Sequence, residues 1–178
     1  MAWQEKLRQF LKNRSGLALN LLFFGAVFIG VSSFQMRNML SASGVEAPDL
    51  AGPLLSGGYY DLAAVNDKPV VVYFFAPWCK FCAVSSDNLT RLRRFRDSES
   101  LEILAVALDW QNRDEVLDYV ERHELNVPVV LGDRNITNEW HVYAFPTYYV
   151  LDSRGQIRHR DLGYSTQFGL WWRSWFVD

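Results

Sequence analysis

Most of the chain alternates between short apolar runs and segments in which apolar residues recur every three or four positions. Runs of β-branched and aromatic residues at 70–75 and 101–108 are typical of strands buried on both faces. Each run leads into a segment with helical spacing, beginning near residue 79 in one case and at residue 113 in the other. This strand–helix–strand–helix order predicts an α/β domain in which the two strands pair in parallel.

The second half of the chain predicts a return to the sheet. A short apolar piece at 127–130 is followed by a brief helix around 135–140. Two further strand-like segments, 147–151 and 156–160, flank a turn that contains Gly155. A tight turn with glycine between two such segments predicts an antiparallel hairpin at this end of the sheet.

Two helices have a predicted inward face. The helix over 113–123 should direct three apolar residues toward the core: Val116, Leu117 and Val120. The last stretch of the chain places five aromatic residues at helical spacing, namely Phe168, Trp171, Trp172, Trp175 and Phe176. An aromatic stripe at this spacing predicts core packing, the alternative being a docking surface for a partner or for the membrane.

The N-terminal region contains an apolar run without charge, Leu17 to Phe34, which is about the length at which a transmembrane helix becomes possible. Four basic residues precede the run and Arg37 alone follows it closely, so the positive-inside rule places the N-terminus in the cytoplasm. A cleaved secretory signal would also export the domain, and a buried helix of that domain is the third interpretation. The expected organisation is a cytoplasmic segment at 1–16, a transmembrane anchor at 17–36, a linker at 37–46 and a folded domain at 47–178.

Charge argues against one class of partner. The net charge is −2, and the acidic groups are concentrated in the expected domain, while residues 1–40 carry five basic side chains and one acidic side chain. Because nucleic-acid binding requires a basic face, no nucleic-acid partner is expected.

The chain has two cysteines, Cys79 and Cys82, at the start of a predicted helix. The helix N-terminus stabilises the thiolate of the first cysteine, which is therefore the predicted nucleophile. Cys82, one turn later, can resolve a mixed disulfide formed by Cys79 or run the same cycle in reverse. Lys80 adds a positive charge beside Cys79, which lowers the pKa of that thiol further.

A purely structural role for the cysteine pair is disfavoured. A disulfide across two intervening residues closes too short a loop to restrict the unfolded chain much, so it would be a weak crosslink. A structural zinc site needs about four ligands, and the sequence has no second cysteine pair and only scattered histidines. No metal or other cofactor is therefore expected, although two thiolates could also bind Cu(I) in a copper-handling protein.

Two motifs resemble the thioredoxin superfamily. Residues 68–82, KPVVVYFFAPWCKFC, resemble its central strand and Trp-Cys-x-x-Cys motif, and residues 145–147, Phe-Pro-Thr, resemble its cis-proline loop. The resemblance covers roughly residues 45–178 and implies a thioredoxin fold, with a central mixed sheet and helices on both faces. It also implies that Pro146 faces the dithiol, that Phe145 offers backbone hydrogen bonds to substrate, and that Trp78 shields Cys79.

Within the superfamily, the chain is most similar to the membrane-anchored TlpA/ResA-like group. The apolar N-terminal segment, the sequence Ala-Pro-Asp-Leu at 47–50 and an added hairpin before the core carry this resemblance. The segments 163–165 and 168–175 are more similar to the suppressor-of-copper-sensitivity D group, which implies a role in copper tolerance. The resemblance implies a single-pass protein of the bacterial inner membrane with its domain in the periplasm, protein thiols or disulfides as substrates, and a membrane-embedded thiol-redox partner.

The chain departs from its relatives behind the cysteine pair. Tyr73 stands where thioredoxins have a buried Asp, and Ser85 stands where ResA-like reductases have a Glu, so Cys82 lacks the usual proton-transfer partner. The intervening dipeptide, Lys80 and Phe81, also differs, and this dipeptide tunes the redox potential. The expected function is that of a reductase or disulfide shuttle supplied by a membrane electron donor, with an oxidase of exported thiols as the alternative.

Overall fold

The computed structural model places the chain in two compact units, Met1–Arg37 and Asn38–Asp178, and describes residues 19–27, 29–31, 33–34, 36–65 and 67–177. Among the described residues, one helix, Leu19–Asn38, is long and apolar enough to cross a membrane, and no part of its apolar stretch is buried. This helix overlaps the anchor expected at 17–36, whereas the expected cytoplasmic segment 1–16 lies outside the described residues.

The second unit begins earlier than the domain start expected at residue 47. After the short helix η1 (Met36–Asn38), strand β1 (Val45–Glu46) pairs antiparallel with β8 (Gln156–Leu162). The Arg160 guanidinium, on β8, donates hydrogen bonds to two backbone carbonyls of residues 39–40. Hydrogen bonds to its backbone thus hold much of the expected linker 37–46 against β8. Such bonds do not depend on apolar side chains, so the hydrophobic pattern of the sequence did not reveal them.

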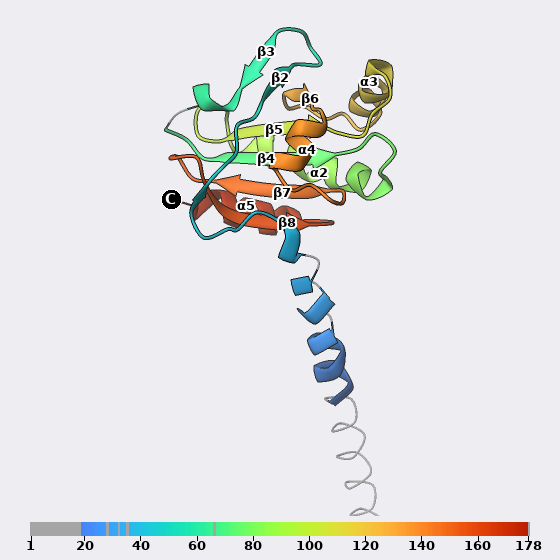
Figure 1. The fold of residues 1–178 in the computed structure, drawn as a ribbon, viewed down its shortest axis with the longest axis vertical. Helices are drawn as coiled ribbons and strands as arrows, with labels where there is room; N and C mark the ends of the chain where they lie inside the picture. The colour runs from blue at the N-terminus through green and yellow to red at the C-terminus, as the bar shows by residue number, and fades with distance from the viewer. Residues whose placement is uncertain (1–18, 28, 32, 35, 66, 178) are drawn as a thin grey trace, which may run out of the picture. The chain divides into compact units, whose positions relative to one another are not determined.

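In the described part of the chain, six strands form the main sheet in the order β1-β8-β7-β4-β5-β6 (Figure 1). The pairs β4·β5 and β5·β6 are parallel, while β7 runs antiparallel to both β4 and β8. The bounds are β4 (Val70–Phe75), β5 (Glu102–Ala107), β6 (Val129–Leu131) and β7 (Thr147–Leu151). The parallel and antiparallel pairings predicted from the sequence are confirmed.

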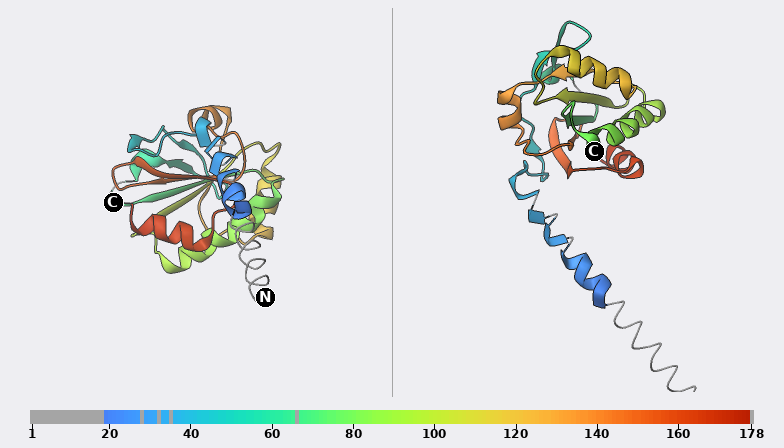
Figure 2. Two further views of the ribbon diagram at one scale, coloured as in Figure 1. Left: turned by 90° about the horizontal axis from the view of Figure 1, so that it is seen from below. Right: turned by 90° about the vertical axis from the view of Figure 1, so that its right-hand side faces the viewer.

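Helices lie on both faces of the sheet (Figure 2). One face packs against α2 (Lys80–Phe95), α3 (Arg113–Arg122) and α5 (Gln167–Trp175), which contribute to a shared hydrophobic core. The other face is covered by α4 (Arg134–Glu139) and by Trp140, whose ring lies 5.3 Å from that of Phe74. We refer to these as the α2 face and the α4 face.

The added hairpin before the core is present. It comprises β2 (Ala51–Pro53) and β3 (Tyr59–Asp61), which form a separate two-stranded sheet, followed by the short helix η2 (Leu62–Ala64). Leu54 in its loop forms an isolated bridge with Val130 of β6. The hairpin therefore extends the β6 edge of the domain.

Two predictions about helix faces are wrong in part. On α3, Leu117 is 39% exposed, and Tyr119 takes the inward position because its ring stacks on Phe75 at 4.6 Å. On α5, the buried residues are Leu170 and Ser174. Four of the five aromatic residues expected in the core are exposed, namely Phe168, Trp172, Trp175 and Phe176, while Trp171 is half-buried.

Candidate active site

The cysteine pair lies where strand β4 leads into helix α2. Cys79 is the N-cap of α2, and its Sγ accepts a hydrogen bond from the backbone N–H of Cys82 at 3.1 Å. The two cysteines form a disulfide, with their Cα atoms 5.2 Å apart. Cys82 is fully buried, and Cys79 keeps 6% of its surface exposed. The position at the helix N-terminus gives the Cys79 sulfur the N–H groups and dipole that stabilise a thiolate when the pair is reduced.

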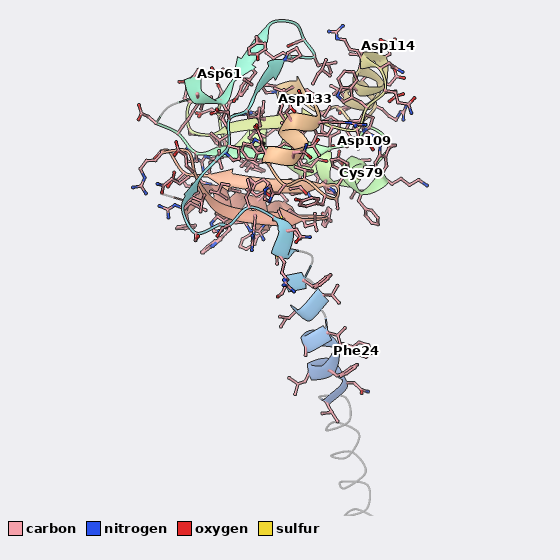
Figure 3. All side chains as sticks on the ribbon, viewed as in Figure 1. Phe24, Asp61, Cys79, Asp109, Asp114 and Asp133 are labelled. Atoms are coloured by element: carbon pink, nitrogen blue, oxygen red, sulfur yellow. A yellow bond between two sulfur atoms is a disulfide. The ribbon has the colours of Figure 1, made fainter. Side chains whose placement is uncertain are left out.

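Trp78 forms an exposed wall beside the disulfide. It is 63% exposed, yet its orientation is fixed because its indole Nε1 donates to the Asp109 carboxylate Oδ2 at 3.0 Å and to the Asp109 carbonyl at 3.2 Å. The Phe145 ring meets the Trp78 ring edge-on at 5.9 Å. Figure 3 places Cys79 and Asp109 at the same end of the sheet.

Asp109 was not among the residues selected from the sequence. It follows the carboxyl end of β5, adjacent to the end of β4 that precedes Cys79, and its backbone is left-handed with φ 52°. Aspartate tolerates that conformation better than most residues. The signal that could have identified it is its place after a parallel strand, since sites form at the carboxyl ends of such strands.

The Phe145–Pro146 peptide bond is cis, as the resemblance implied. The loop is held on both sides, because the Pro146 carbonyl accepts from the Gly163 N–H at 2.8 Å and the Thr147 hydroxyl donates to the Ala144 carbonyl at 2.8 Å. Phe145 packs against the core cluster that contains both cysteines. The structure thus brings the two sequence motifs together at one site.

The interior behind Cys82 is lined by hydroxyl groups. The Tyr73 hydroxyl donates to the Cys82 carbonyl at 3.0 Å, and the Ser86 hydroxyl donates to the same oxygen at 2.9 Å. Ser86 is also 2.7 Å from the Tyr119 hydroxyl. Tyr119 and Ser86 were missed from the sequence, because residues on a strand and two helices give no local pattern that joins them.

Comparison with known proteins agrees with this geometry. Residues 43–160 match the model of the AhpC/TSA family. The chain belongs to the AhpC/TSA family.

Among the relatives of this chain, the thioredoxin-like protein YneN of Bacillus subtilis is 28% identical over 137 residues, covering 76% of this chain and 80% of the relative. A thioredoxin-like protein of Haemophilus influenzae is 26% identical and covers 97% of this chain and 98% of the relative. The thiol-disulfide oxidoreductase ResA of Geobacillus kaustophilus is 27% identical, with 91% and 92% covered.

Solved structures show the same fold. A thioredoxin family thiol:disulfide interchange protein from Chlorobium tepidum TLS has a TM-score of 0.66 at 20% identity, with 74% of this chain and 94% of that chain covered. StoA from Bacillus subtilis has a TM-score of 0.61 at 21% identity, with 69% and 93% covered. The fold is therefore the thioredoxin fold, and together with the ResA relatives and the close cysteine pair it makes this AhpC/TSA member a thiol–disulfide oxidoreductase.

The remaining two predicted site residues lie on the outer surface. Lys80 and Phe81, between the cysteines, are both exposed, and Phe81 is 71% exposed. They occupy the first turn of α2, so a charge and a large apolar side chain flank the disulfide on its solvent side.

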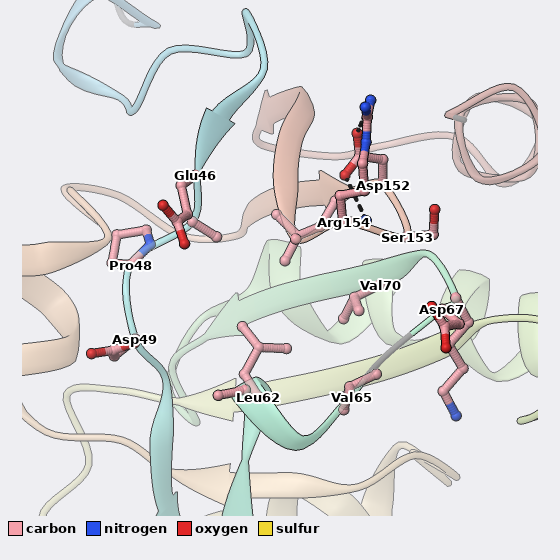
Figure 4. A pocket seen from close by; sticks show the side chains of 15 residues that line it. Glu46, Pro48, Asp49, Leu62, Val65, Asp67, Val70, Asp152, Ser153 and Arg154 are labelled. Atoms are coloured by element: carbon pink, nitrogen blue, oxygen red, sulfur yellow. Dashed lines mark hydrogen bonds and ion pairs between the residues drawn. The ribbon is translucent and has the colours of Figure 1, made fainter.

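A cavity of about 300 Å³ lies away from this site (Figure 4). Its lining includes Val70, the first residue of β4, whereas the cysteine pair follows the last residue of that strand. Asp152, which also lines it, is already paired with Arg154 and Arg158. The cavity contains neither cysteine and has no part in the site.

Proposed function

We propose that the protein catalyses thiol–disulfide exchange on protein substrates, with Cys79 as the nucleophile and Cys82 as the resolving cysteine. The observation that supports this most is the position of Cys79, which caps α2 and keeps a small exposed surface while its partner is fully buried. In the reducing direction, the Cys79 thiolate attacks a substrate disulfide and forms a mixed disulfide. Cys82 then attacks Cys79 Sγ, so that the substrate leaves as a dithiol and the Cys79–Cys82 bond closes.

The surface around the pair supplies the proposed substrate contacts. Trp78 and Phe145 form an aromatic wall beside Cys79, and the cis bond before Pro146 turns the loop backbone at this edge. We assign substrate binding to Phe145 and Pro146, and we assign tuning of the Cys79 thiolate to Trp78, Lys80 and Phe81.

The proposed location is the periplasmic side of a bacterial inner membrane. The helix Leu19–Asn38 would serve as a single-pass anchor, and the basic residues that precede it favour a cytoplasmic N-terminus. A membrane-embedded thiol-redox partner would supply electrons to a reductase or disulfide shuttle. The alternative within the same chemistry is an oxidase of exported thiols, and a Cu(I)-handling protein related to copper tolerance is the alternative from another class.

Two substitutions in the full-length protein, purified in detergent, test the mechanism. Cys79→Ser should abolish exchange with a disulfide-bonded protein such as insulin, and Cys82→Ser should accumulate a mixed disulfide visible on a non-reducing gel. Retained exchange in Cys79→Ser would overturn the mechanism. If the protein carried copper instead, both substitutions would reduce Cu(I) affinity alike, because both thiolates would be ligands.

The reduction potential of the pair decides the direction. A value near that of thioredoxin, about −270 mV, would support the reductase, whereas a value near −120 mV would support the oxidase and remove the reductase proposal.

A further inference from the structure

Five hydroxyl groups are buried together on the α2 face beside Cys82. They belong to Tyr73 on β4, Tyr148 on β7, Tyr119 on α3, and Ser85 and Ser86 on α2. Tyr73 and Tyr148 stand opposite each other in the β4·β7 pair, with ring centroids 4.9 Å apart. Such a concentration of hydroxyl groups is unusual in a core, because each one must find a hydrogen-bond partner.

Three of these groups are fully accounted for in the disulfide form. Tyr73 and Ser86 both donate to the Cys82 carbonyl, and Ser86 pairs with Tyr119. These contacts fix the backbone at Cys82 and link it to the sheet and to α3.

The other two groups have no hydrogen-bond partner among the described residues. The oxygens of Ser85 and Tyr148 are both buried from solvent. A buried hydroxyl left unpaired destabilises the protein, so two adjacent examples call for a physical reason. Ser85 lies three residues after Cys82 on α2, and side chains at that spacing are neighbours on one face of a helix.

The tyrosines in this cluster are neutral hydrogen-bond donors. Burial raises the pKa of Tyr73 and of Tyr119. Burial also raises the pKa of Tyr148, and the Ser85 hydroxyl, which lies close by without meeting hydrogen-bond geometry, lowers that pKa in part. At neutral pH each phenol therefore keeps its proton and can donate it to a hydrogen bond.

We propose that the Ser85 and Tyr148 hydroxyls are positioning residues that donate hydrogen bonds to the Cys82 sulfur when the disulfide is open. This inference rests on the proposed function and concerns how the same pair is tuned. In the oxidised protein the Cys82 sulfur is bonded to Cys79, and the two hydroxyls have no partner among the described residues. Reduction creates the acceptor that they lack.

The chemical step shows why such donors are needed. A thiolate of a dithiol reductant attacks Cys79 Sγ, the Cys79–Cys82 bond breaks, and its electron pair remains on Cys82 Sγ as a buried thiolate. The second thiol of the reductant then displaces Cys79, so that the reductant leaves as a disulfide; its remaining proton and one proton from water end on the two cysteine sulfurs. A buried anion without hydrogen bonds is costly, and hydroxyl donors reduce that cost.

The test compares the parent protein with Ser85→Ala and Tyr148→Phe, each as the full-length protein in detergent. The equilibrium constant of the pair is measured against glutathione redox buffers. Each substitution should favour the disulfide by about 3- to 10-fold, because it removes one donor from the reduced form only. Tyr60→Phe is the matched control, since the Tyr60 oxygen is likewise buried and forms no hydrogen bond of normal geometry with the described residues, but lies in the β2–β3 hairpin.

A second readout follows the sulfur itself. The chain has only two cysteines, so ¹³Cβ-labelled cysteine gives two signals, which Cys79→Ser assigns. In the reduced protein, Ser85→Ala and Tyr148→Phe should each raise the pKa of the Cys82 thiol, and Tyr60→Phe should leave it unchanged.

The outcomes separate this inference from the proposed function. A shift in either variant without a shift in Tyr60→Phe supports the inference. Values within twofold of the parent in both variants, or an equal shift in the control, would overturn it. Neither readout uses a protein substrate, so failure of exchange with insulin would count against the proposed function alone.

Discussion

Tyr148 and Tyr149 are consecutive residues of β7, both fully buried, and they lie on opposite faces of the sheet. On the α4 face, the Tyr149 hydroxyl accepts from the Leu40 N–H at 3.2 Å and donates to the Trp140 carbonyl at 2.9 Å. On the α2 face, the Tyr148 hydroxyl has no partner among the described residues. Two tyrosines in consecutive positions therefore differ: the Tyr149 hydroxyl is fully hydrogen-bonded, whereas the Tyr148 hydroxyl, on the face that contains the cysteine pair, has a donor that is not used among the described residues.

The two faces also differ in what surrounds these tyrosines. Around Tyr149, the rings of Phe74 and Trp140 lie 6.2 and 5.5 Å away, and the Trp140 indole donates to the Asp49 carbonyl. Around Tyr148, the neighbours include Tyr73 and Ser85, which carry further hydroxyls. The comparison indicates that the α4 face is built for stability, whereas the α2 face gives up some stability to serve the disulfide.

The largest expected effect on stability is on the α4 face. Trp140 is fully buried, so Trp140→Ala should lower the free energy of unfolding by about 3–5 kcal/mol, since it leaves a large cavity. Urea unfolding followed by far-UV circular dichroism measures this loss. The equilibrium constant of the cysteine pair with glutathione should stay within twofold of the parent value. A decrease in the free energy of unfolding of less than about 1 kcal/mol would contradict the structural role assigned to the α4 face.

A matched pair of substitutions tests the comparison directly. Tyr149→Phe should cost about 1–3 kcal/mol, because it leaves the Trp140 carbonyl and the Leu40 N–H without their partner. Tyr148→Phe should instead raise the free energy of unfolding of the oxidised protein, by up to about 1–3 kcal/mol, because it removes a buried hydroxyl that makes no hydrogen bond among the described residues. The same urea titrations measure both. Equal losses would show that the two hydroxyls are equivalent and would end the distinction between the faces.

The sequence predicted this architecture well where the signal was local. The run at 70–75 and the spacing after it gave β4 and the start of α2, because a buried strand and an amphipathic helix have different periods. The cysteine pair and the cis bond before Pro146 were recognised because their motifs are contiguous.

What the sequence did not predict depends on contacts between distant segments. Tyr73, Tyr119 and Tyr148 are brought together by three different elements, so no spacing in the chain marks them as a group. The inward face of α5 was also not predicted, because packing against α2 selects Leu170 and Ser174 from a helix whose larger residues lie elsewhere on its surface.

A third prediction concerns a buried charge that is fully partnered, in contrast to Tyr148. The Asp152 carboxylate, just after β7, accepts from the backbone N–H groups of Arg154 and Gln156 and from the Arg158 guanidinium. Burial raises its pKa, but these hydrogen bonds outweigh burial and hold the pKa below its ordinary value of 3.8. Its contribution to stability is therefore present above pH 3.8 and is lost as the pH falls through the lower folded-state value.

Asp152→Asn should accordingly cost about 1–2 kcal/mol at pH 7, from the loss of charge-assisted hydrogen bonds. Urea unfolding across pH 2–7 should show the difference between parent and variant narrowing below about pH 4. A difference that is constant with pH would mean that the carboxylate charge contributes nothing to the turn.

The smallest expected effect on the free energy of unfolding is at Trp172, on the solvent side of α5. Trp172 lies on α5 with 51% of its surface exposed, and its closest ring contact is with Phe176, which is itself exposed. Trp172→Gln should change the free energy of unfolding by less than about 0.5 kcal/mol, because Trp172 is a surface residue whose nearest ring contact is with another exposed side chain. The same urea titrations measure this change. A loss above about 1 kcal/mol would restore the expectation that the aromatic stripe is core, whereas no loss would confine the packed core of this face to the Leu170 side of the helix.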